Sequence, residues 1–224
     1  DLTTAEFLDK YPFCRGKTST IYTYFNVDEM RIKALEKYDF SYDKNKINFL
    51  AVGRFSEQKS YDRLIEAFKI IATENKNVLL HFVGNDKTAV GDNIKAVIKK
   101  YNLDNKVVLH GVLDNPYPYI KDCDCLISSS LYEGFPRVIN EAISLGKLCI
   151  GTNVTGTKEA LHNGELGILV DDSIDGLVNG MRIYINNPKI INDYKDKIEN
   201  FDGNKKSYFE GLEILNMKKK KMII

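Results

Sequence analysis

The stretch SSLYEGFPRVINEAISLG, residues 129–146, contains the end of an apolar run, a turn and the start of a helical pattern. Two serines close the apolar run. Gly134 permits a close backbone approach that a side chain would block, and Pro136 suits the entry to a helix. Apolar residues then recur at helical spacing from about Arg137 onward. The stretch therefore predicts a strand, a tight loop and a helix in direct succession.

Two carboxylates frame this helix start. Glu133 lies in the loop, and Glu141 follows eight positions later, about one turn inside the helix. Carboxylates so placed can accept hydrogen bonds from hydroxyl groups on two parts of one ligand. The first amides of the helix, near Val138 and Ile139, attract negative charge such as a phosphate. Taken alone, the two acids fit equally well an ordinary helix start, with Glu133 favoured by the helix dipole and Glu141 on the helix surface.

The same alternation of apolar runs and helical patterns extends over most of the chain. Strands are predicted at 47–53, 77–84, 106–111, 124–129, 147–152 and 167–170, and helices at 60–75, 91–101, 116–122, 137–146 and 173–186. This order predicts an α/β fold with a doubly wound parallel sheet. Ligands of such sheets bind at the carboxyl ends of the strands, near a topological switch point.

The two ends of the chain do not follow the repeat. Residues 1–46 contain one strand-like segment, 19–25, and a turn at Asn26 before a charged helix. We interpret them as a connecting region with a first packing helix. At the other end, 188–217 predicts two helices, followed by the basic run KKKK at 218–221, which we expect to be a solvated tail.

A second set of candidate residues follows the first predicted strand. Gly53 ends that strand, Arg54 and Lys59 lie on either side of a short turn, and a helix begins near Ser60. Two cations and free backbone donors at this point could hold a diphosphate. Without further context, the residues favour Arg54 and Lys59 as surface charges at a helix start. The loop after the second predicted strand carries Gly84 and Asn85, which could face a nucleoside or form a plain turn.

Composition excludes several classes of protein. Lys and Arg total 32 against 31 Asp and Glu, so the net charge of +1 gives no reason to expect nucleic-acid binding. No apolar run approaches the length of a membrane span, and the first residues lack the pattern of a signal peptide, which indicates a cytoplasmic protein. The four cysteines have no spacing that suits a disulfide framework or a zinc site.

With these residues in view, the chain resembles the carboxyl-terminal, nucleotide-sugar-binding domain of the retaining GT-B glycosyltransferases, family four. The resemblance covers about residues 47–175 and rests on five segments in order: GRFSEQKSYDRLIEAF, HFVGND, VVLHGVLDN, CDCLISSSLYEGFPRVINEAISLGK and GTNVTGTKEALHNGELGILV. It implies a Rossmann-like half of a GT-B fold at 47–187, with connecting residues at 1–46 and helices and the basic tail at 188–224. The implied enzyme is a bacterial hexosyltransferase of surface polysaccharide or glycoconjugate synthesis.

The resemblance also implies roles for individual residues. Arg54 and Lys59 match the basic pair that holds the donor diphosphate and stabilises the leaving group. Glu133 matches the acid that contacts sugar hydroxyls, and Glu141 the acid that contacts the ribose. The remaining matches are the strand end Gly53, the sugar-facing loop and helix start Gly134, Phe135, Pro136, Arg137, Val138 and Ile139, and the walls around base and ribose Gly84, Asn85, Val112 and Leu113.

The substrate implied is a nucleoside-diphosphate sugar, with UDP-sugar preferred over GDP-sugar, and no metal or other cofactor is required. A separate amino-terminal domain would supply most of the acceptor site, so we expect this chain to be the donor-binding part of a longer enzyme. The resemblance leaves open an association of that enzyme with the inner face of the membrane. Two other interpretations stay open: a non-catalytic nucleotide-binding or interaction module, and a sugar-nucleotide epimerase.

This sequence departs from the family pattern at three places. Ser60 replaces a frequent Gly, Leu148 replaces a frequent Pro, and Asn85-Asp86 replaces an acidic residue followed by Gly. The last departure lies where the resemblance assigns the contacts to the base and ribose.

Overall fold

The computed structural model describes residues 2–221, and for 215–221 it describes the backbone alone. Within this part of the chain, six parallel strands form one sheet in the order β3-β2-β1-β4-β5-β6. The strands are β1 (Ile47–Val52), β2 (Val78–Val83), β3 (Val107–Leu109), β4 (Cys125–Ser128), β5 (Cys149–Thr152) and β6 (Ile168–Val170). Each lies within its predicted range, which confirms the predicted α/β fold.

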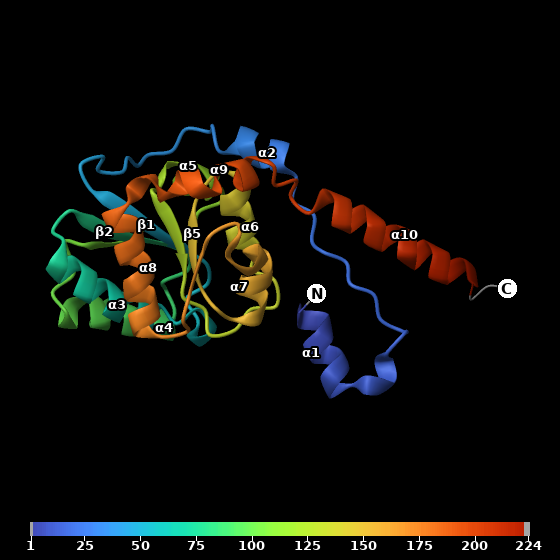
Figure 1. The fold of residues 1–224 in the computed structure, drawn as a ribbon. Helices are drawn as coiled ribbons and strands as arrows, with labels where there is room; N and C mark the ends of the chain where they lie inside the picture. The colour runs from blue at the N-terminus through green and yellow to red at the C-terminus, as the bar shows by residue number, and fades with distance from the viewer. Residues whose placement is uncertain (1, 222–224) are drawn as a thin grey trace.

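Helices cover both faces of the sheet (Figure 1). One face carries α3 (Tyr61–Glu74), α4 (Ala89–Lys100) and α8 (Ile174–Asn186). The other carries α5 (Tyr117–Asp122), α6 (Arg137–Ser144), α7 (Thr155–Ala160) and α9 (Ile191–Glu199). Each predicted crossover helix is present, with ends shifted by at most two residues.

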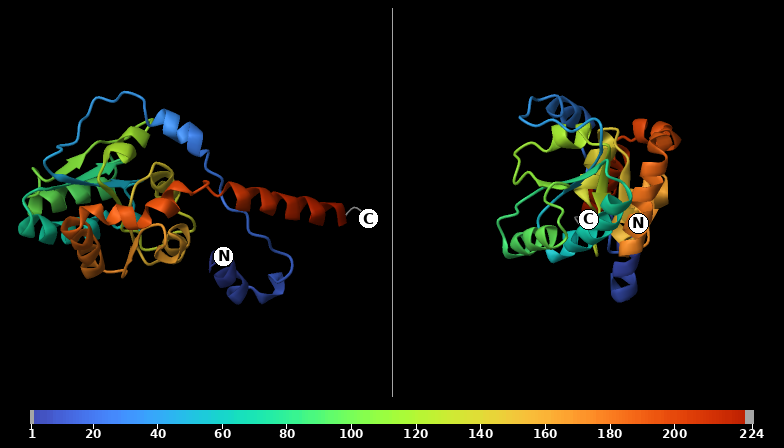
Figure 2. Two further views of the ribbon diagram at one scale, coloured as in Figure 1. Left: turned by 45° about the horizontal axis from the view of Figure 1, so that its top comes forward. Right: turned by 90° about the vertical axis from the view of Figure 1, so that its left-hand side faces the viewer.

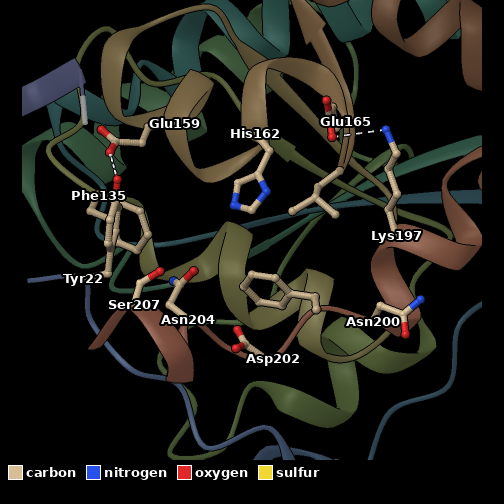
Figure 3. Close-up of a pocket in the computed structure, with 12 residues that line it drawn as sticks. Tyr22, Phe135, Glu159, His162, Glu165, Lys197, Asn200, Asp202, Asn204 and Ser207 are labelled. Carbon is tan, nitrogen blue, oxygen red and sulfur yellow. Dashed lines mark hydrogen bonds and ion pairs between the residues drawn. The ribbon is translucent and has the colours of Figure 1, made fainter. Parts of the chain in front are cut away.

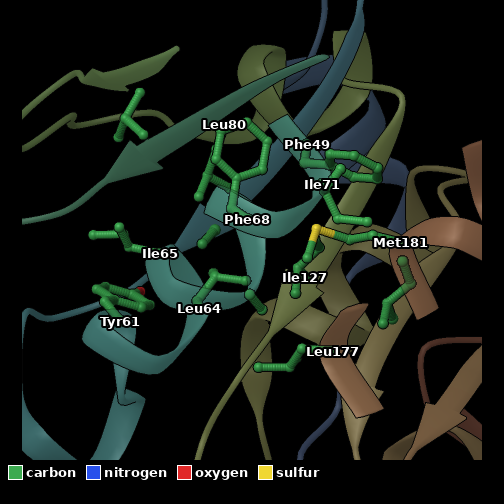
Figure 4. Packing of buried hydrophobic residues seen from close by; sticks show 14 of the residues in the cluster. Phe49, Tyr61, Leu64, Ile65, Phe68, Ile71, Leu80, Ile127, Leu177 and Met181 are labelled. Atoms are coloured by element: carbon green, nitrogen blue, oxygen red, sulfur yellow. The ribbon is translucent and has the colours of Figure 1, made fainter. Parts of the chain in front are cut away.

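The core consists of two hydrophobic layers separated by the sheet. In β1, Phe49 and Ala51 belong to one layer and Leu50 to the other, as the alternation of side chains along a strand requires. Figure 4 shows Phe49 packed near Phe68 and Met181 in the first layer. All six residues of β2 are buried, which is typical of a parallel strand covered on both faces.

The strand order creates a topological switch point. Chain order runs outward from β1 to β3 and then returns to place β4 on the other side of β1. The loops after β1 and β4 therefore lie side by side. The Leu131 amide donates to the Gln58 carbonyl at 2.9 Å, and the Ser129 hydroxyl donates to the Lys59 carbonyl at 2.7 Å. This is the place where a doubly wound sheet offers a ligand crevice.

The predicted strand-like segment 19–25 is not a strand, and this expectation was wrong. At its end, the Phe25 amide donates a backbone hydrogen bond to the Gly203 carbonyl, at 2.8 Å. A strand requires a row of such bonds along its length. The alternating pattern is satisfied instead by side-chain contacts, such as the Tyr22 ring on Phe135.

The charged helix predicted after the turn is present as α2 (Val27–Lys33), and Asn26 caps it by accepting a hydrogen bond from the Glu29 amide. The chain also begins with a helix that was not predicted, α1 (Leu2–Lys10). The two helices predicted near the other end are α9 and α10 (Lys205–Lys221). In Figures 1 and 2, α1 and α10 project beyond the body that contains the sheet.

The prediction of a solvated basic tail at 218–221 concerns side chains outside the described part of the structure. Among the helices that the structure describes, none has the length and apolar content needed to cross a bilayer.

Candidate functional site

An ion pair joins the two loops at the switch point. Lys59 ends a short 3-10 helix, η2 (Glu57–Lys59), in the loop after β1, and Glu133 lies in the loop after β4. The Lys59 Nζ and Glu133 Oε1 atoms are 2.5 Å apart, and the two side chains are 17% and 9% exposed. Two of the sequence-predicted residues, far apart in the chain, are thus in direct contact.

Two further residues hold the Glu133 carboxylate, and the sequence analysis did not identify either. The Ser130 hydroxyl donates to Oε1 at 2.7 Å. The Gln58 side-chain amide donates to the Tyr132 carbonyl at 2.8 Å and lies 3.4 Å from Oε2. Ser130 stands in the visible serine run at the strand end, whereas nothing in the sequence distinguishes Gln58 from a surface residue.

A buried hydroxyl group lies next to this pair. Tyr61, at the first position of α3, is 3% exposed, and its hydroxyl has no hydrogen-bond partner among the described residues. A Cβ atom added to Gly53 would lie 3.0 Å from that hydroxyl and 3.1 Å from the Lys59 Cε atom. Gly53 therefore lets the Lys59 side chain pass over the end of β1.

Arg54 occupies a different environment from Lys59. Its side chain is exposed, and it forms no ion pair with any residue that the structure describes. Next to it, Gly53 and Gly84 meet closely, since a Cβ atom on Gly84 would lie only 1.9 Å from the Gly53 carbonyl oxygen. The loops after β1 and β2 are in contact for this reason.

The start of α6 brings further predicted residues to the same edge of the sheet. The N-cap residue, Pro136, makes no side-chain cap, so the first helical amides receive no acceptor from it. Gly134 is exposed, Val138 is half-buried and Ile139 is fully buried. The Phe135 ring packs against Tyr22, with ring centroids 5.6 Å apart.

The second acid of the stretch lies apart from the first. Glu141 is 13% exposed, and its Oε1 atom lies 3.8 Å from the Arg137 guanidinium. Burial raises the pKa of Glu141, and Arg137 opposes this increase. The Tyr117 ring is close enough that Glu141 contributes to raising its pKa, after the larger effect of burial. Glu141 is thus neither a simple surface residue nor a contact of Glu133.

The residues predicted to surround a nucleoside follow β2 and β3. The Gly84 amide donates to the Gly111 carbonyl at 2.8 Å. Asn85 is exposed and accepts a hydrogen bond from the Lys87 amide at 3.0 Å. Val112 is 69% exposed, and Leu113 packs partly against the second core layer. The structure places all of them after strand ends at the same edge, and their contact with a ligand stays a prediction.

No group of three or more His, Cys, Asp or Glu side chains in the described residues is arranged to hold a metal ion. The expectation that the protein works without a metal stays a prediction.

Comparison with known proteins identifies the family of the chain. Residues 34–201 match the family described as glycosyl transferases group 1. The chain is 30% identical over 194 residues to the Campylobacter jejuni N-acetylgalactosamine-N,N'-diacetylbacillosaminyl-diphospho-undecaprenol 4-alpha-N-acetylgalactosaminyltransferase, covering 86% of this chain and 51% of that protein. The chain therefore spans about half the length of that relative.

Solved glycosyltransferase structures share the fold. A glycosyltransferase from Rickettsia africae superposes with a TM-score of 0.80 at 22% identity, over 95% of this chain and 60% of that one. Anabaena HepE, solved in complex with UDP and glucose, gives a TM-score of 0.70 at 20% identity, over 88% of this chain and 56% of that one.

Proposed function

The chain belongs to the glycosyl transferases group 1 family, and from this membership we propose that it is the donor-binding part of a retaining hexosyltransferase. The donor is a nucleoside-diphosphate sugar. The acceptor is a saccharide or a lipid-linked saccharide of surface polysaccharide or glycoconjugate synthesis.

The observation that carries the proposal is the meeting of Lys59 and Glu133 at the switch point of the sheet. A cation and a carboxylate in contact, beside a helix start, provide complementary groups for a diphosphate and for sugar hydroxyls. Exposed Arg54, on the same loop as Lys59, adds a guanidinium that binds phosphate through two parallel hydrogen bonds.

In the proposed reaction, an acceptor hydroxyl oxygen forms a bond to the anomeric carbon of the donor sugar. The bond between that carbon and the diphosphate oxygen breaks, the diphosphate leaves with the electron pair, and the hydroxyl proton is released. Negative charge grows on the leaving diphosphate. Arg54, Lys59 and the first amides of α6 are assigned to stabilise it as preorganised positive groups, without a metal ion.

Uracil is the base that we propose. The support is the likeness in fold to Anabaena HepE, which was solved with UDP and glucose. For the acceptor, the support is the name of the Campylobacter relative, whose substrate is a diphospho-undecaprenol-linked saccharide. Since the chain spans 51% of that relative, we assign most of the acceptor site to a second domain of the whole enzyme. We also propose that the whole enzyme acts in the cytoplasm, at the inner surface of the membrane.

Calorimetric titration of the chain with UDP, GDP and their sugars tests the proposal. Arg54→Gln is the most informative variant because Arg54 has no ion-pair partner among the described residues whose loss would disturb the fold. Losing a charge-assisted contact to phosphate should weaken UDP binding about tenfold. Arg15→Gln is the matched control, since Arg15 is another exposed arginine and is remote from the strand ends in sequence. Within the described part of the chain, its one ion-pair partner is the exposed Asp9.

UDP binding that is equally strong in Arg54→Gln and in the control would overturn the assignment of the phosphate site. Tighter binding of GDP than of UDP would overturn the choice of base alone.

A further inference from the structure

A second hollow lies next to the loop between β4 and α6, which contains Glu133 and is called the donor loop below. Lys59 is not among the residues that line this hollow. It has a volume of about 380 Å³ and lies between η3 (His162–Gly164) and the segment 200–207, which contains the link from α9 to α10 and the start of α10 (Figure 3). Its lining includes none of the cationic residues assigned to the diphosphate. Its size falls within the range of small-molecule sites.

Aromatic rings form part of this pocket. Phe135 and Tyr22 line it with their ring centroids 5.6 Å apart, and Phe201 lines it with its ring centroid 6.4 Å from that of His162. Phe201 is 8% exposed, so its ring position is fixed by the core. Aromatic rings offer rigid apolar area with polar groups at their edges, which suits the mixed apolar and hydroxyl surface of a sugar ring.

Carboxylates outnumber cations in the lining of the pocket, with Glu159, Glu165 and Asp202 against Lys197. Glu159 accepts a hydrogen bond from the Tyr22 hydroxyl at 2.5 Å, and Asp202 accepts one from the Lys206 amide at 3.1 Å. Each carboxylate has further lone pairs available. The Lys197 amine in the lining is paired with Glu165 at 3.2 Å. This excess of carboxylate disfavours a phosphate and favours a neutral ligand that donates hydroxyl hydrogens.

The backbone at His162 is unusual. His162 has a φ of 47° and Asn163 a φ of 57°, two consecutive left-handed residues that are not glycine. Such conformations cost free energy and persist where the surroundings impose them, often at binding sites. In Figure 3 the His162 ring lies between the Tyr22–Glu159 pair and the Glu165–Lys197 pair. The strained turn thus places the His162 imidazole at the pocket. Each of its two nitrogens can donate or accept a hydrogen bond there.

The pocket continues toward the donor loop. A smaller hollow of about 220 Å³ shares Tyr22, Phe135 and Glu159 with it and reaches Gly134. Gly134 and Phe135 directly follow Glu133 in the chain. A ligand in the pocket would therefore extend to the loop to which the donor sugar is assigned.

We propose that this pocket is a saccharide-binding subsite, which holds a neutral sugar of the acceptor beside the donor loop. Its identification with the acceptor rests on the proposed function. Binding of a sugar in the pocket does not. The subsite adds a contribution from this chain to an acceptor site otherwise assigned to a second domain.

The test is a nuclear magnetic resonance titration of the isotope-labelled chain with methyl glycosides of glucose, galactose and N-acetylglucosamine, and separately with UDP. The glycosides should shift signals of His162, Phe135 and Asn204, and UDP should shift those of 53–60. Asp202→Asn removes a charged acceptor yet retains an oxygen for the Lys206 amide, and it should weaken glycoside binding about threefold. Glu199→Gln, an exposed acid of α9 outside the lining, is the matched control and should bind glycosides as the unchanged protein does.

The outcomes separate the two proposals. UDP binding at 53–60 with no glycoside effect on the pocket residues would overturn the saccharide subsite and leave the donor site standing. Glycoside binding in the pocket without any UDP binding would keep the subsite and overturn the proposed function. Shifts of His162 and Asn204 caused by UDP would contradict the charge argument and with it the subsite.

Discussion

At the level of single residues, the contact between Lys59 and Glu133 has a consequence for ligand binding. Both side chains are largely buried and are only 2.5 Å apart, so in the free protein the cation is already engaged. A diphosphate that binds Lys59 must compete with Glu133 for it. Glu133 then becomes available to the hydroxyl groups of the sugar.

Glu133→Gln should therefore bind UDP more tightly than the unchanged protein does. Removing a competing partner worth about 1 kcal/mol gives about a fivefold gain. UDP-sugar should gain less than UDP, because the amide replaces a carboxylate at the sugar. Calorimetry with both ligands measures the two changes. Weaker UDP binding by Glu133→Gln would instead show that the pair preorganises Lys59 for the phosphate.

The histidine pair in the second core layer predicts a dependence of stability on pH. His81 Nδ1 and His110 Nε2 are 3.0 Å apart, and burial lowers the pKa of His81 to about 3 and that of His110 to about 4. The unfolded chain binds protons near the ordinary histidine pKa, so it binds more protons than the folded chain between pH 7 and pH 4. Stability is fully present above about pH 7 and falls as the pH decreases through this window.

We expect the free energy of unfolding to fall by about 4 kcal/mol between pH 7 and pH 5, about 2 kcal/mol for each histidine, in a range where most carboxylates remain charged. Urea denaturation at each pH measures it. His110→Gln should reduce this fall. An equal fall in this variant would assign the effect to other groups.

The role of a residue could be predicted from the sequence where a local motif indicated it. It could not be predicted where the role depends on contact with a residue distant in sequence. Glu133 and Lys59 stood out because each lies at a strand end next to a glycine or a helix start. Their mutual contact could not be predicted without the strand order. Gln58 and the strained His162 carry no sequence signal, since their importance comes from residues more than 30 positions away.

At the level of elements, the strands were predictable because each is a short apolar run closed by a small residue, and a fully buried parallel strand has no other pattern. The segment 19–25 shows the limit of this reasoning. Its alternation of aromatic and polar residues fits a strand, yet its side chains pack on Phe135 and on the segment around Gly203. An alternating sequence pattern indicates which side chains pack against the rest of the protein. It does not indicate whether the segment itself is a strand or an extended loop.

The start of α6 is tied to the chain that leaves α9. The Asn140 amide donates to the Pro136 carbonyl at 3.0 Å, and its side-chain oxygen lies 3.4 Å from the Asn204 amide nitrogen. Asn140 is 1% exposed, so each of these polar groups would be costly to leave unpaired.

Asn140→Ala should reduce the free energy of unfolding by about 2 kcal/mol, as expected for buried hydrogen bonds lost without replacement. Denaturation in urea measures this change. Asn93→Ala is the control, because Asn93 is an exposed asparagine in helix α4, and its loss should change stability by less than about 0.5 kcal/mol. Equal effects of the two substitutions would show that the Asn140 contacts carry no stability.

For the whole molecule, the sequence predicted the doubly wound sheet and the edge at which ligands should bind. It did not show how α1 and α10 extend beyond the sheet, because neither helix has an apolar face that indicates where it packs (Figure 2). The chain spans about half of the Campylobacter relative. We therefore propose that the carboxyl edge of the sheet binds the donor. The pocket lined by Phe135 and His162 adds part of the acceptor site.

The most direct test of this account is a crystal structure of the chain with bound UDP. The account predicts the diphosphate at the carboxyl ends of β1 and β4, within hydrogen-bond distance of Arg54, of Lys59 released from Glu133, and of the first amides of α6. A diphosphate bound in the pocket of His162 and Asp202, or at the amino ends of the strands, with Lys59 still paired to Glu133, would contradict it.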